Sequence, residues 1–541
     1  MEDSSDGNVD PTSMPEPAEE FVQHIYPRAR TAFMYDRAGP WPQPAPDHPM
    51  SMAAEVLHPP QVEQDDWKKH AGRNYMWTML TSIPGAAWNS LTHGRVNDMS
   101  DEVFAELLTT TIYSKYMRLA DPAELDPCFT EVLGEVSGAA EYYTIDFTPV
   151  QDIKTYEGVW VSPTITLVAR DEEGGKCKAL AIRIGHLEGT GSDRHWENIA
   201  VTPEDTDAWT LAKYFVMQGA GHVTTLSGHP ATHFPYDTVN AVTKSAVPMD
   251  HTLFKLLFPH LRLALAVDHA VLEGGSSVVS ETRGEIYAPY SGPGSSVRVL
   301  VAAGFVGYPH QLATYDPSPT PSAAHPKWEY PLSPRAIDIP SDFGRVLRAY
   351  YFTVKDFVRE VVEEILAQKD TKKGKEELFF IRRWARYIAH WLPGFPDGDR
   401  ILELDENGDP WLVAAVTGYI WDVSVAHSLD HKNFYSLRPR RTPFRVRLPP
   451  PSSRKIDKVK LRSICNGWDL FKSTLAFDMF FQPHNVVVLQ DAEYGFEGPK
   501  LKEAVANFQK ALVATEEKLK ADGVNVKNYI ELSEIATSIQ Y

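Results

Sequence analysis

The stretch from residue 228 to residue 265, GHPATHFPYDTVNAVTKSAVPMDHTLFKLLFPHLRLAL, holds four of the nineteen histidines of the chain. His229 and His233 lie four positions apart, so on a helix their imidazoles would share one face and could bind the same ion. A spacing of this kind also arises by chance in a chain with so many histidines. The pair alone therefore does not establish a metal site, and the rest of the sequence has to decide.

A second pair with the same spacing, His427 and His431, lies in GYIWDVSVAHSLDHKNF, which covers residues 418–434. Histidines are also concentrated around the first pair, because six of the nineteen fall between residues 222 and 269. A single histidine is most often a core or surface residue, but two pairs in apolar helical surroundings favour a shared site. Two such pairs on facing helices would supply four nitrogen donors.

Sites rich in imidazole suit iron, manganese, copper or zinc, and the sequence alone does not choose between them. The pattern H-E-x-x-H is absent, so the chain lacks the general base of the zinc proteases. Four neutral imidazoles leave a divalent ion fully charged. A fifth, anionic ligand together with one open position would give an octahedral centre capable of redox chemistry.

The composition is that of an ordinary globular protein, with 43% hydrophobic and 23% charged residues among 541. The net charge of -19 argues against nucleic acid as a partner, because binding to a phosphate backbone needs clustered lysine and arginine. The basic segment RKIDKVKLR, residues 454–462, is short and is interpreted as a solvated face. Three scattered cysteines form neither a disulfide framework nor a C-x-x-C metal pattern. No run of eighteen apolar residues occurs, so no transmembrane segment is expected.

The beginning of the chain is acidic and polar, and residues 1–20 are expected to be a disordered tail. This tail lacks the apolar core of a secretory signal, which favours a cytoplasmic location. Residues 21–541 are expected to form one domain, with a proline-rich extended part over residues 40–60.

The hydrophobic pattern predicts a mainly α fold with a small β portion in the N-terminal half. Strands are expected in YYTIDF (142–147), VWVSPTITLVAR (159–170) and CKALAIRIG (177–185). Beyond residue 203 apolar residues recur at helical spacing, beginning with PEDTDAWTLAKYFVMQGAG. Further helices are expected over residues 251–272, 342–367, 375–391, 411–430 and 498–520. A short β portion followed by a long helical body suggests one large helical domain.

The residues that follow the first histidine pair resemble the signature of the lipoxygenases, in which a histidine pair precedes a segment of the form HPxxKLLxPHxR. Here seventeen residues separate His233 from His251 and eight more precede His260, within HTLFKLLFPHLRLAL. Ahead of the pair, SDEVFAELL, YYTIDFTPV, GVWVSPTITLVA, KALAIRIG and DTDAWTLAKYFVMQ follow the order of the family. Behind it, IWDVSVAHSLDHKNF resembles the second metal helix, and RVRLPPP and NYIELSEIATSIQY resemble the later motifs. The resemblance covers roughly residues 95–541.

The resemblance implies a large lipoxygenase-like catalytic domain that binds one non-haem iron, with manganese as the alternative. The two metal helices of the family correspond to the two histidine pairs, so the implied ligands are His229, His233, His427 and His431. The carboxylate of Tyr541 is implied as the fifth, anionic ligand. No catalytic side chain is implied beyond the water or hydroxide on the metal.

The remaining histidines have other expected roles. His251 and His260 belong to the family signature and are expected to pack and form hydrogen bonds around the metal helix. His222 is interpreted as structural or as a neighbour of the ligands. His269 and His484 match nothing in the family pattern.

The chemistry that the resemblance implies begins with removal of a hydrogen atom from a doubly allylic CH2 group and ends with a hydroperoxide. The implied partners are a polyunsaturated fatty acid, or a similar polyene, and O2. The protein would hold the ion, exclude water and offer an apolar channel to the chain of the substrate. Two alternatives stay open. One is an enzyme that acts on a specialised-metabolite polyene or isomerises a hydroperoxide, and the other is a non-catalytic lipoxygenase-like binding protein.

The first histidine pair departs from most plant and animal lipoxygenases, in which one more residue separates the two ligands. The shorter spacing resembles fungal members, including manganese-containing ones. Pro230 and Pro235 flank the pair, and a proline inside a helix removes a hydrogen bond and disfavours helical geometry in the residue before it. We therefore expect His229 to lie at a break or distortion of the metal helix.

Three residues are candidates for contact with the substrate. Val271, eleven residues after His260, occupies the position of an alanine or glycine that the family associates with stereochemistry. Ala270 occupies the position of an arginine in many animal members, which leaves Arg262 as a candidate partner for a fatty-acid carboxylate. The family usually ends in isoleucine or valine, so Tyr541 needs room for its ring if its carboxylate is to bind the ion. The β-sandwich domain that precedes plant and animal members is not expected, because only the polar tail precedes residue 21.

Overall fold

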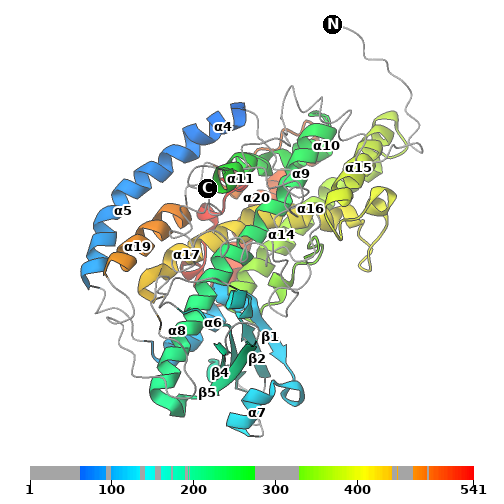
Figure 1. Cartoon of the computed structure of the whole chain (residues 1–541). Helices are drawn as coiled ribbons and strands as arrows, with labels where there is room; N and C mark the ends of the chain where they lie inside the picture. The colour runs from blue at the N-terminus through cyan, green and yellow to red at the C-terminus, as the bar shows by residue number, and fades with distance from the viewer. Residues whose placement is uncertain are drawn as a thin grey trace.

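The computed structural model describes residues 61–92, 99–134, 141–152, 160–171, 175–188, 193, 195–273, 328–441, 448, 467–483 and 487–540 (Figure 1). The predicted tail, the proline-rich part over residues 40–60, the basic segment at 454–462, His484 and Tyr541 lie outside these residues. Most of the described chain is helical, and one small sheet lies in its N-terminal half. The prediction of a mainly α fold with a small β portion is therefore confirmed.

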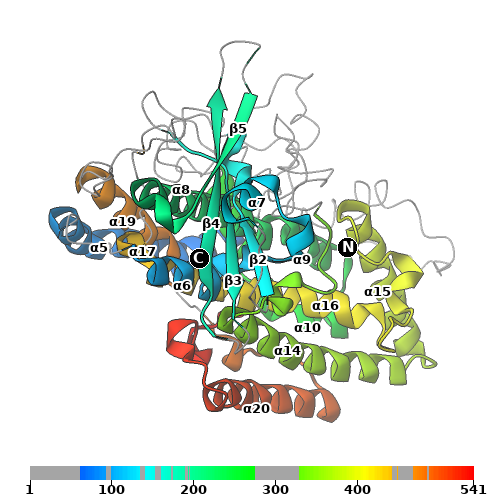
Figure 2. The ribbon, with the colours of Figure 1, turned by 90° about the horizontal axis from the view of Figure 1, so that it is seen from below.

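The sheet has five antiparallel strands that run in chain order (Figures 1 and 2). Their bounds are β1 (Met117–Ala120), β2 (Glu141–Asp146), β3 (Thr164–Arg170), β4 (Lys178–Glu188) and β5 (His195–Val201). The helix α7 (Pro127–Leu133) packs on β4 and β5, and α8 (Thr206–Val223) packs on β3, β4 and β5. Side chains on the two faces belong to different clusters, with Leu167 beside Phe129 of α7 and Val168 in the main core. Because both faces are covered, the strands are more apolar than simple alternation requires.

The strand predicted over residues 159–170 is shorter in the structure, because β3 begins only at Thr164. Pro163 directly precedes it and has no backbone N–H to donate to a ladder. The other two predicted strands correspond to β2 and β4. The flanking strands β1 and β5 were not predicted, since neither carries a long alternating pattern.

The helical body is built from long helices that lie side by side (Figure 1). Besides α7 and α8, the described helices are α4 (Gln61–Trp67), α5 (Arg73–Thr92), α6 (Asp101–Thr110), α9 (Phe234–Ala246), α10 (Thr252–Leu257), α11 (Ala264–Glu273), α14 (Asp342–Ala367), α15 (Lys372–Trp391), α16 (Trp411–Trp421), α17 (His427–Arg441), α19 (Gly467–Phe481) and α20 (Pro499–Ala521). The helix α14 packs between α16 and α20, and Figure 2 shows α20 running beside it. The main core includes the apolar faces of α14, α16 and α20 and one face of the sheet.

Local sequence signals explain where the long helices begin. The Ser341 hydroxyl accepts a hydrogen bond from the Gly344 N–H and caps α14, whose bounds match the predicted 342–367. The Thr371 hydroxyl caps α15 in the same way through the Gly374 N–H, so that helix begins three residues before the predicted 375. The helix α20 runs from Pro499 to Ala521, close to the predicted 498–520.

The prediction of one continuous helix over residues 251–272 was wrong. The structure divides it into α10, a short 3-10 turn at Phe258–His260 and α11. Leu263, just before α11, has a φ of 68°, which a leucine rarely adopts and which no α-helix can contain. Proline 259 inside the turn also lacks the N–H that a continuous helix would use. The break turns α11 so that its Asp268 faces the first histidine pair.

The predicted helix over residues 411–430 is interrupted as well. It consists of α16, a π turn at Asp422–Ala426 and α17. The continuous segment Trp411–Phe434 is long and apolar enough to cross a membrane, but all of its tested window is buried inside the protein. A core helix of a large domain meets the same criterion, so this one segment is weak evidence for a membrane span.

The last described residues form an extended segment that is fixed by side chains from distant helices. The Nδ1–H of His260 donates to the Thr537 carbonyl oxygen at 2.6 Å, and the Nε2 of the same ring lies 3.0 Å from the Tyr494 hydroxyl. The Ser538 hydroxyl donates to the Arg262 carbonyl oxygen at 2.7 Å. The chain at Ser538 and at Gln540 is fully buried.

The close approach of Tyr116 to Gly228 generates a stability prediction. A Cβ at residue 228 would lie 2.3 Å from the Tyr116 hydroxyl oxygen and 3.5 Å from its Cζ. Gly228→Ala should therefore lower the free energy of unfolding by about 1–3 kcal/mol, as measured by urea denaturation. Adding Tyr116→Phe removes the clashing oxygen and should recover part of the loss. Gly85→Ala is the control, because nothing lies within 4 Å of its added Cβ, and it should not destabilise. Additive losses in the double variant would contradict the predicted contact.

The buried His260 makes stability depend on pH. Burial lowers its pKa from 6.5 to about 4, although the hydrogen bond to Thr537 acts in the opposite direction. The unfolded chain therefore binds more protons between pH 6.5 and 4. The stabilisation is complete above pH 6.5 and is lost as the pH falls through this window, by up to about 3 kcal/mol. Denaturation between about pH 7 and 4.5 should give a shallower pH dependence for His260→Gln than for the wild type. An equal slope in both proteins would contradict a buried neutral imidazole at this position.

Candidate metal centre

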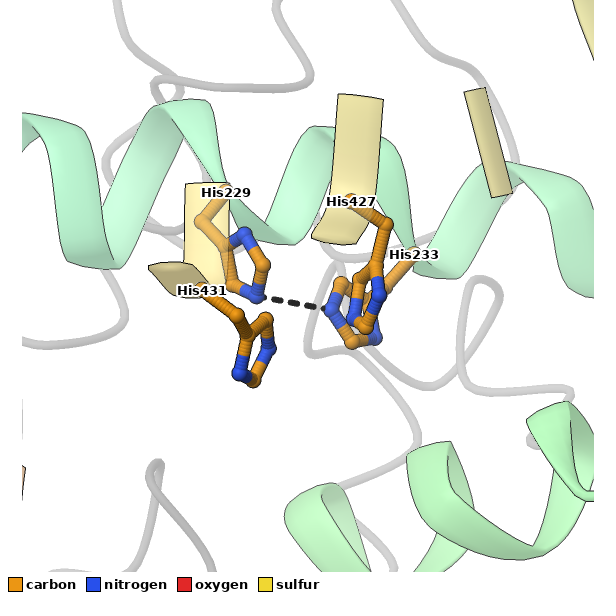
Figure 3. A group of neighbouring side chains, drawn as sticks. All are labelled: His229, His233, His427 and His431. Atoms are coloured by element: carbon orange, nitrogen blue, oxygen red, sulfur yellow. Dashed lines mark hydrogen bonds between the residues drawn. The ribbon is translucent and has the colours of Figure 1, made fainter. Parts of the chain in front are cut away.

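The four predicted histidines converge on one point in the interior (Figure 3). One ring nitrogen from each of His229, His233, His427 and His431 lies within 4.8 Å of the corresponding atoms of the others, and all four side chains are buried. The Nε2 atoms of His229 and His233 are 2.9 Å apart. Nitrogens at such separations can bind one ion together, so the geometry fits the donor set expected from the sequence.

Each histidine pair follows directly after a π turn in a long helix. The first turn is Thr224–Gly228, between α8 and His229, and the second is Asp422–Ala426, between α16 and His427. A π turn shifts the helix face, which lets the residues after it point in a new direction while the helix continues. Such turns are frequent at functional sites.

The expected distortion at His229 is confirmed. The π turn precedes this residue, and a 3-10 turn at Pro230–Thr232 follows it before α9 begins. The reason differs in one respect from the prediction, because His229 itself keeps helical dihedrals, with φ at -70° and ψ at -46°. The irregularity lies on both sides of His229 and not in its own backbone.

Two carboxylates orient the first pair. The Nδ1 of His233 lies 2.8 Å from Oδ1 of Asp268 on α11, and the Nδ1 of His229 lies 3.4 Å from Oδ2 of Asp430 on α17. A carboxylate at Nδ1 favours the tautomer that keeps the proton there, which leaves the Nε2 lone pair for an ion. Both carboxylates are buried, and the other oxygen of Asp430 accepts a hydrogen bond from the Lys115 ammonium group.

Electrostatics favour neutral imidazoles beside a cation. Burial lowers the pKa of His229 and His427 well below the ordinary value, and neighbouring imidazoles and Lys115 act in the same direction. Neutral imidazole is the form that binds a metal. Burial also raises the pKa of Asp430, and Lys115 opposes that shift. Two carboxylates and one ammonium group around four neutral rings leave a formal charge of about -1 when all three are ionised, which suits a bound cation.

The two carboxylates were missed in the sequence. Asp430 lies inside the second H-x-x-x-H and Asp268 is an acidic residue in the apolar run LRLALAVDHAV, which are visible features. A buried acid in an apolar helix needs a partner, and that rule could have marked Asp268. The pairing itself depends on the break at Leu263, which the sequence did not predict.

His251, His260 and His222 bond to protein groups outside the cluster, as expected for structural histidines. The Nδ1 of His251 lies 3.0 Å from a Glu377 carboxylate oxygen, and its Nε2 lies 3.1 Å from the Glu377 carbonyl oxygen, so it joins α10 to α15. His260 fixes the C-terminal segment. His222 lies 2.7 Å from the Gln218 carbonyl oxygen inside α8, and burial lowers its pKa to about 4.

Of the remaining predicted site residues, the structure describes the side chain of Arg262. Arg262 is part-exposed and pairs with Asp66 of α4 at 3.3 Å, so its described contact is with a protein carboxylate. Ala270 and Val271 belong to α11, but their side chains lie outside the described part, as does Tyr541. The fifth ligand and the substrate contacts therefore stay predictions.

Sequence comparison relates the chain to lipoxygenases. No protein-family profile matches it. The polyunsaturated fatty acid lipoxygenase ALOX12 of Mus musculus is 23% identical over 422 residues, which is 74% of this chain and 58% of that protein. The polyunsaturated fatty acid lipoxygenase ALOX15 of Bos taurus is 24% identical over 425 residues, 74% of this chain and 59% of the relative. The chain thus spans less than two thirds of the length of these curated relatives.

Solved structures share the fold along almost the whole chain. A manganese lipoxygenase matches with a TM-score of 0.65 and 15% identity, and the match covers 98% of this chain and 99% of that one. A coral 8R-lipoxygenase matches with a TM-score of 0.63 and 15% identity over 98% of this chain and 82% of its own. The chain is thus similar in sequence to curated lipoxygenases and shares the fold of solved lipoxygenase structures.

Proposed function

We propose that the protein is a non-haem metal dioxygenase of the lipoxygenase type, which converts a polyunsaturated fatty acid and O2 into a lipid hydroperoxide. The observation that carries the proposal is the buried cluster of four imidazoles, with ligand atoms within 4.8 Å of one another. The curated relatives are named polyunsaturated fatty acid lipoxygenases, which supports this substrate class.

The residues that would hold the ion are His229, His233, His427 and His431, with the Tyr541 carboxylate as the proposed fifth ligand. Iron or manganese bound there would supply the one-electron oxidation and reduction that the reaction needs. A manganese lipoxygenase is among the proteins that share the fold, so both metals belong to the proposal.

The proposed work of the neighbouring side chains is to keep the imidazoles in one orientation. Asp268 holds the Nδ1 proton of His233, and Asp430 does the same for His229. Lys115 holds Asp430 in place through its ion pair. These contacts set the ring orientations independently of the ion, which would limit the reorganisation that metal binding requires.

Aromatic side chains keep water from one side of the cluster. The Phe434 ring packs edge-on against His229 with centroids 5.6 Å apart, and the Phe481 ring lies 5.5 Å from that of His431. The two phenylalanine rings also contact each other at 4.5 Å. A dry, apolar surround protects a radical from side reactions and suits the apolar chain of a fatty acid.

Metal content and activity together test the proposed ligands. Purified wild-type protein should contain one iron or manganese ion per chain, and it should consume O2 and form conjugated-diene absorbance with linoleate. His427→Ala should lose both the ion and the activity, because it removes a nitrogen donor from the cluster. The matched control is His222→Gln, which changes a buried histidine outside the cluster and should keep both.

The other outcomes separate the competing functions. Metal without diene formation would contradict fatty-acid oxygenation and would favour a different polyene or hydroperoxide isomerisation. Absence of metal, with His427→Ala unchanged in every property, would overturn the enzyme and support a non-catalytic binding protein.

The role of Asp268 gives a second prediction about the centre. Asp268→Ala should weaken metal affinity by about 10–100-fold, because His233 loses the partner that fixes its tautomer and ring. Asp268→Asn should lose less, since its amide oxygen can still accept the Nδ1 proton. Competition with a chelator measures both affinities. The exposed Asp250 supplies the control variant Asp250→Ala, and equal affinities in all four proteins would show that Asp268 does not position the ligand.

A further inference from the structure

A cavity of about 740 Å³ lies beside the metal cluster, and Ala231, Thr232 and Ala426 form part of its wall. These residues flank the histidines in sequence, but none of the four imidazoles is among the described side chains that line the cavity. Its volume is typical of sites for small organic molecules, which usually occupy 300–1,000 Å³. The cavity therefore lies next to the proposed reaction site, and its described lining does not include the four imidazoles.

Arg118 of β1 lies in the cavity wall and bonds to backbone carbonyls of its own segment. One of its terminal nitrogens donates to the carbonyl oxygens of Lys115 and Met117, both at 2.7 Å. Its Nε is buried and has no hydrogen-bond partner in the described structure. The guanidinium of this part-buried arginine is thus held by nearby backbone carbonyls, and its buried Nε is left for an anion to accept from.

A second guanidinium lies nearby. Arg335 lines the exposed side of the same cavity. Burial together with this like charge lowers the pKa of Arg118, and Asp146 and Tyr116 act in the opposite direction without outweighing them. No described carboxylate lies within 4.0 Å of a charged nitrogen of either arginine. Two close guanidinium groups repel each other, and an anion between them would remove that repulsion.

The other charged groups of the cavity do not neutralise these arginines. Lys115 is already paired with Asp430, and Arg400 lies over the ring of Trp411. The acidic groups in the wall are Glu329, which is exposed, and Asp422, whose pKa burial raises to about 7. At neutral pH Asp422 is therefore only partly charged, so Arg118, Arg335 and Arg400 outnumber the acidic groups of the described wall.

The remaining wall is largely apolar and aromatic. Trp328, Tyr330 and Trp421 line it together with Pro331 and Leu332. The polar atoms of two of these rings already have partners, because the Tyr330 hydroxyl donates to the Ala415 carbonyl and the Trp421 N–H donates to the Leu347 carbonyl. The rings thus offer their apolar faces to the cavity.

We propose that this cavity binds a small carboxylic acid with an apolar body, whose carboxylate lies between Arg118 and Arg335. The apolar body packs along the aromatic wall toward Thr232. The site is distinct from the metal centre, and binding there requires no metal and no turnover.

Decanoate and decanol are suitable probes, because they share an alkyl chain and differ in charge. Isothermal titration of the full chain, with and without metal, should show decanoate binding in both forms. Arg335→Gln should weaken decanoate binding about tenfold or more and leave decanol binding nearly unchanged. Ser333→Glu, which adds a carboxylate at the exposed rim of the cavity, should weaken decanoate more than Ser333→Gln does.

Arg345→Gln is the matched control, since Arg345 is exposed and paired with Asp342 outside the cavity, and it should not change the affinity. Equal decanoate affinity in wild type, Arg335→Gln and Ser333→Glu would overturn the proposal. An equal loss for decanoate and decanol would overturn it as well, because charge would then play no part. Loss of binding on metal removal would place the probe at the metal centre and would also overturn the separate site. A failure of the proposed oxygenation would leave all of these results unaffected.

Discussion

Four buried imidazoles, each with a ring nitrogen within 4.8 Å of one from every other ring, are the constraint on which the rest of the structure depends. Charged imidazolium groups would repel one another at such distances and would lack solvation, and both effects favour neutral rings at His229 and His427. Neutral rings still need a partner for each polar nitrogen. Asp268 and Asp430 meet that need for the first pair from two different helices, α11 and α17. The cluster therefore requires that segments distant in the chain be fixed relative to one another.

A few specific contacts within the helical body fix these distant segments relative to one another. The positive φ of Leu263 gives α11 the direction that brings Asp268 to His233. His260, three residues earlier, connects the same region to the C-terminal segment and to Tyr494. An unusual backbone conformation of this kind typically costs 1–3 kcal/mol and persists only where its surroundings hold it. Here the surroundings are fully buried, and the cost is offset by the packing of the adjacent leucines.

Much of the fold and of the centre could be predicted from the sequence, for physical reasons. The long helices α14, α15 and α20 carry a continuous apolar stripe. Ser341 and Thr371 cap the first two, and α20 begins with Pro499 in its first turn, so local sequence defines all three. The two H-x-x-x-H pairs also identify the convergent histidines. The sequence did not reveal the break at Leu263, because a leucine gives no sign of a left-handed conformation. Contacts such as His233 with Asp268 could not be predicted either, since they arise only after that break has turned the helix.

The π turns ahead of His229 and His427 have a consequence for how such a centre could change over generations. A π turn holds one more residue than the corresponding α turn, and one residue rotates a helix by about 100°. Upstream of each turn, α8 and α16 keep the face that packs in the core, while the residues downstream face the cluster. A single-codon insertion or deletion at either turn would therefore change which side chains reach the interior point without disturbing the upstream packing. The residues that face the cluster could therefore change by mutation while the core-packing residues of the same helix stay as they are.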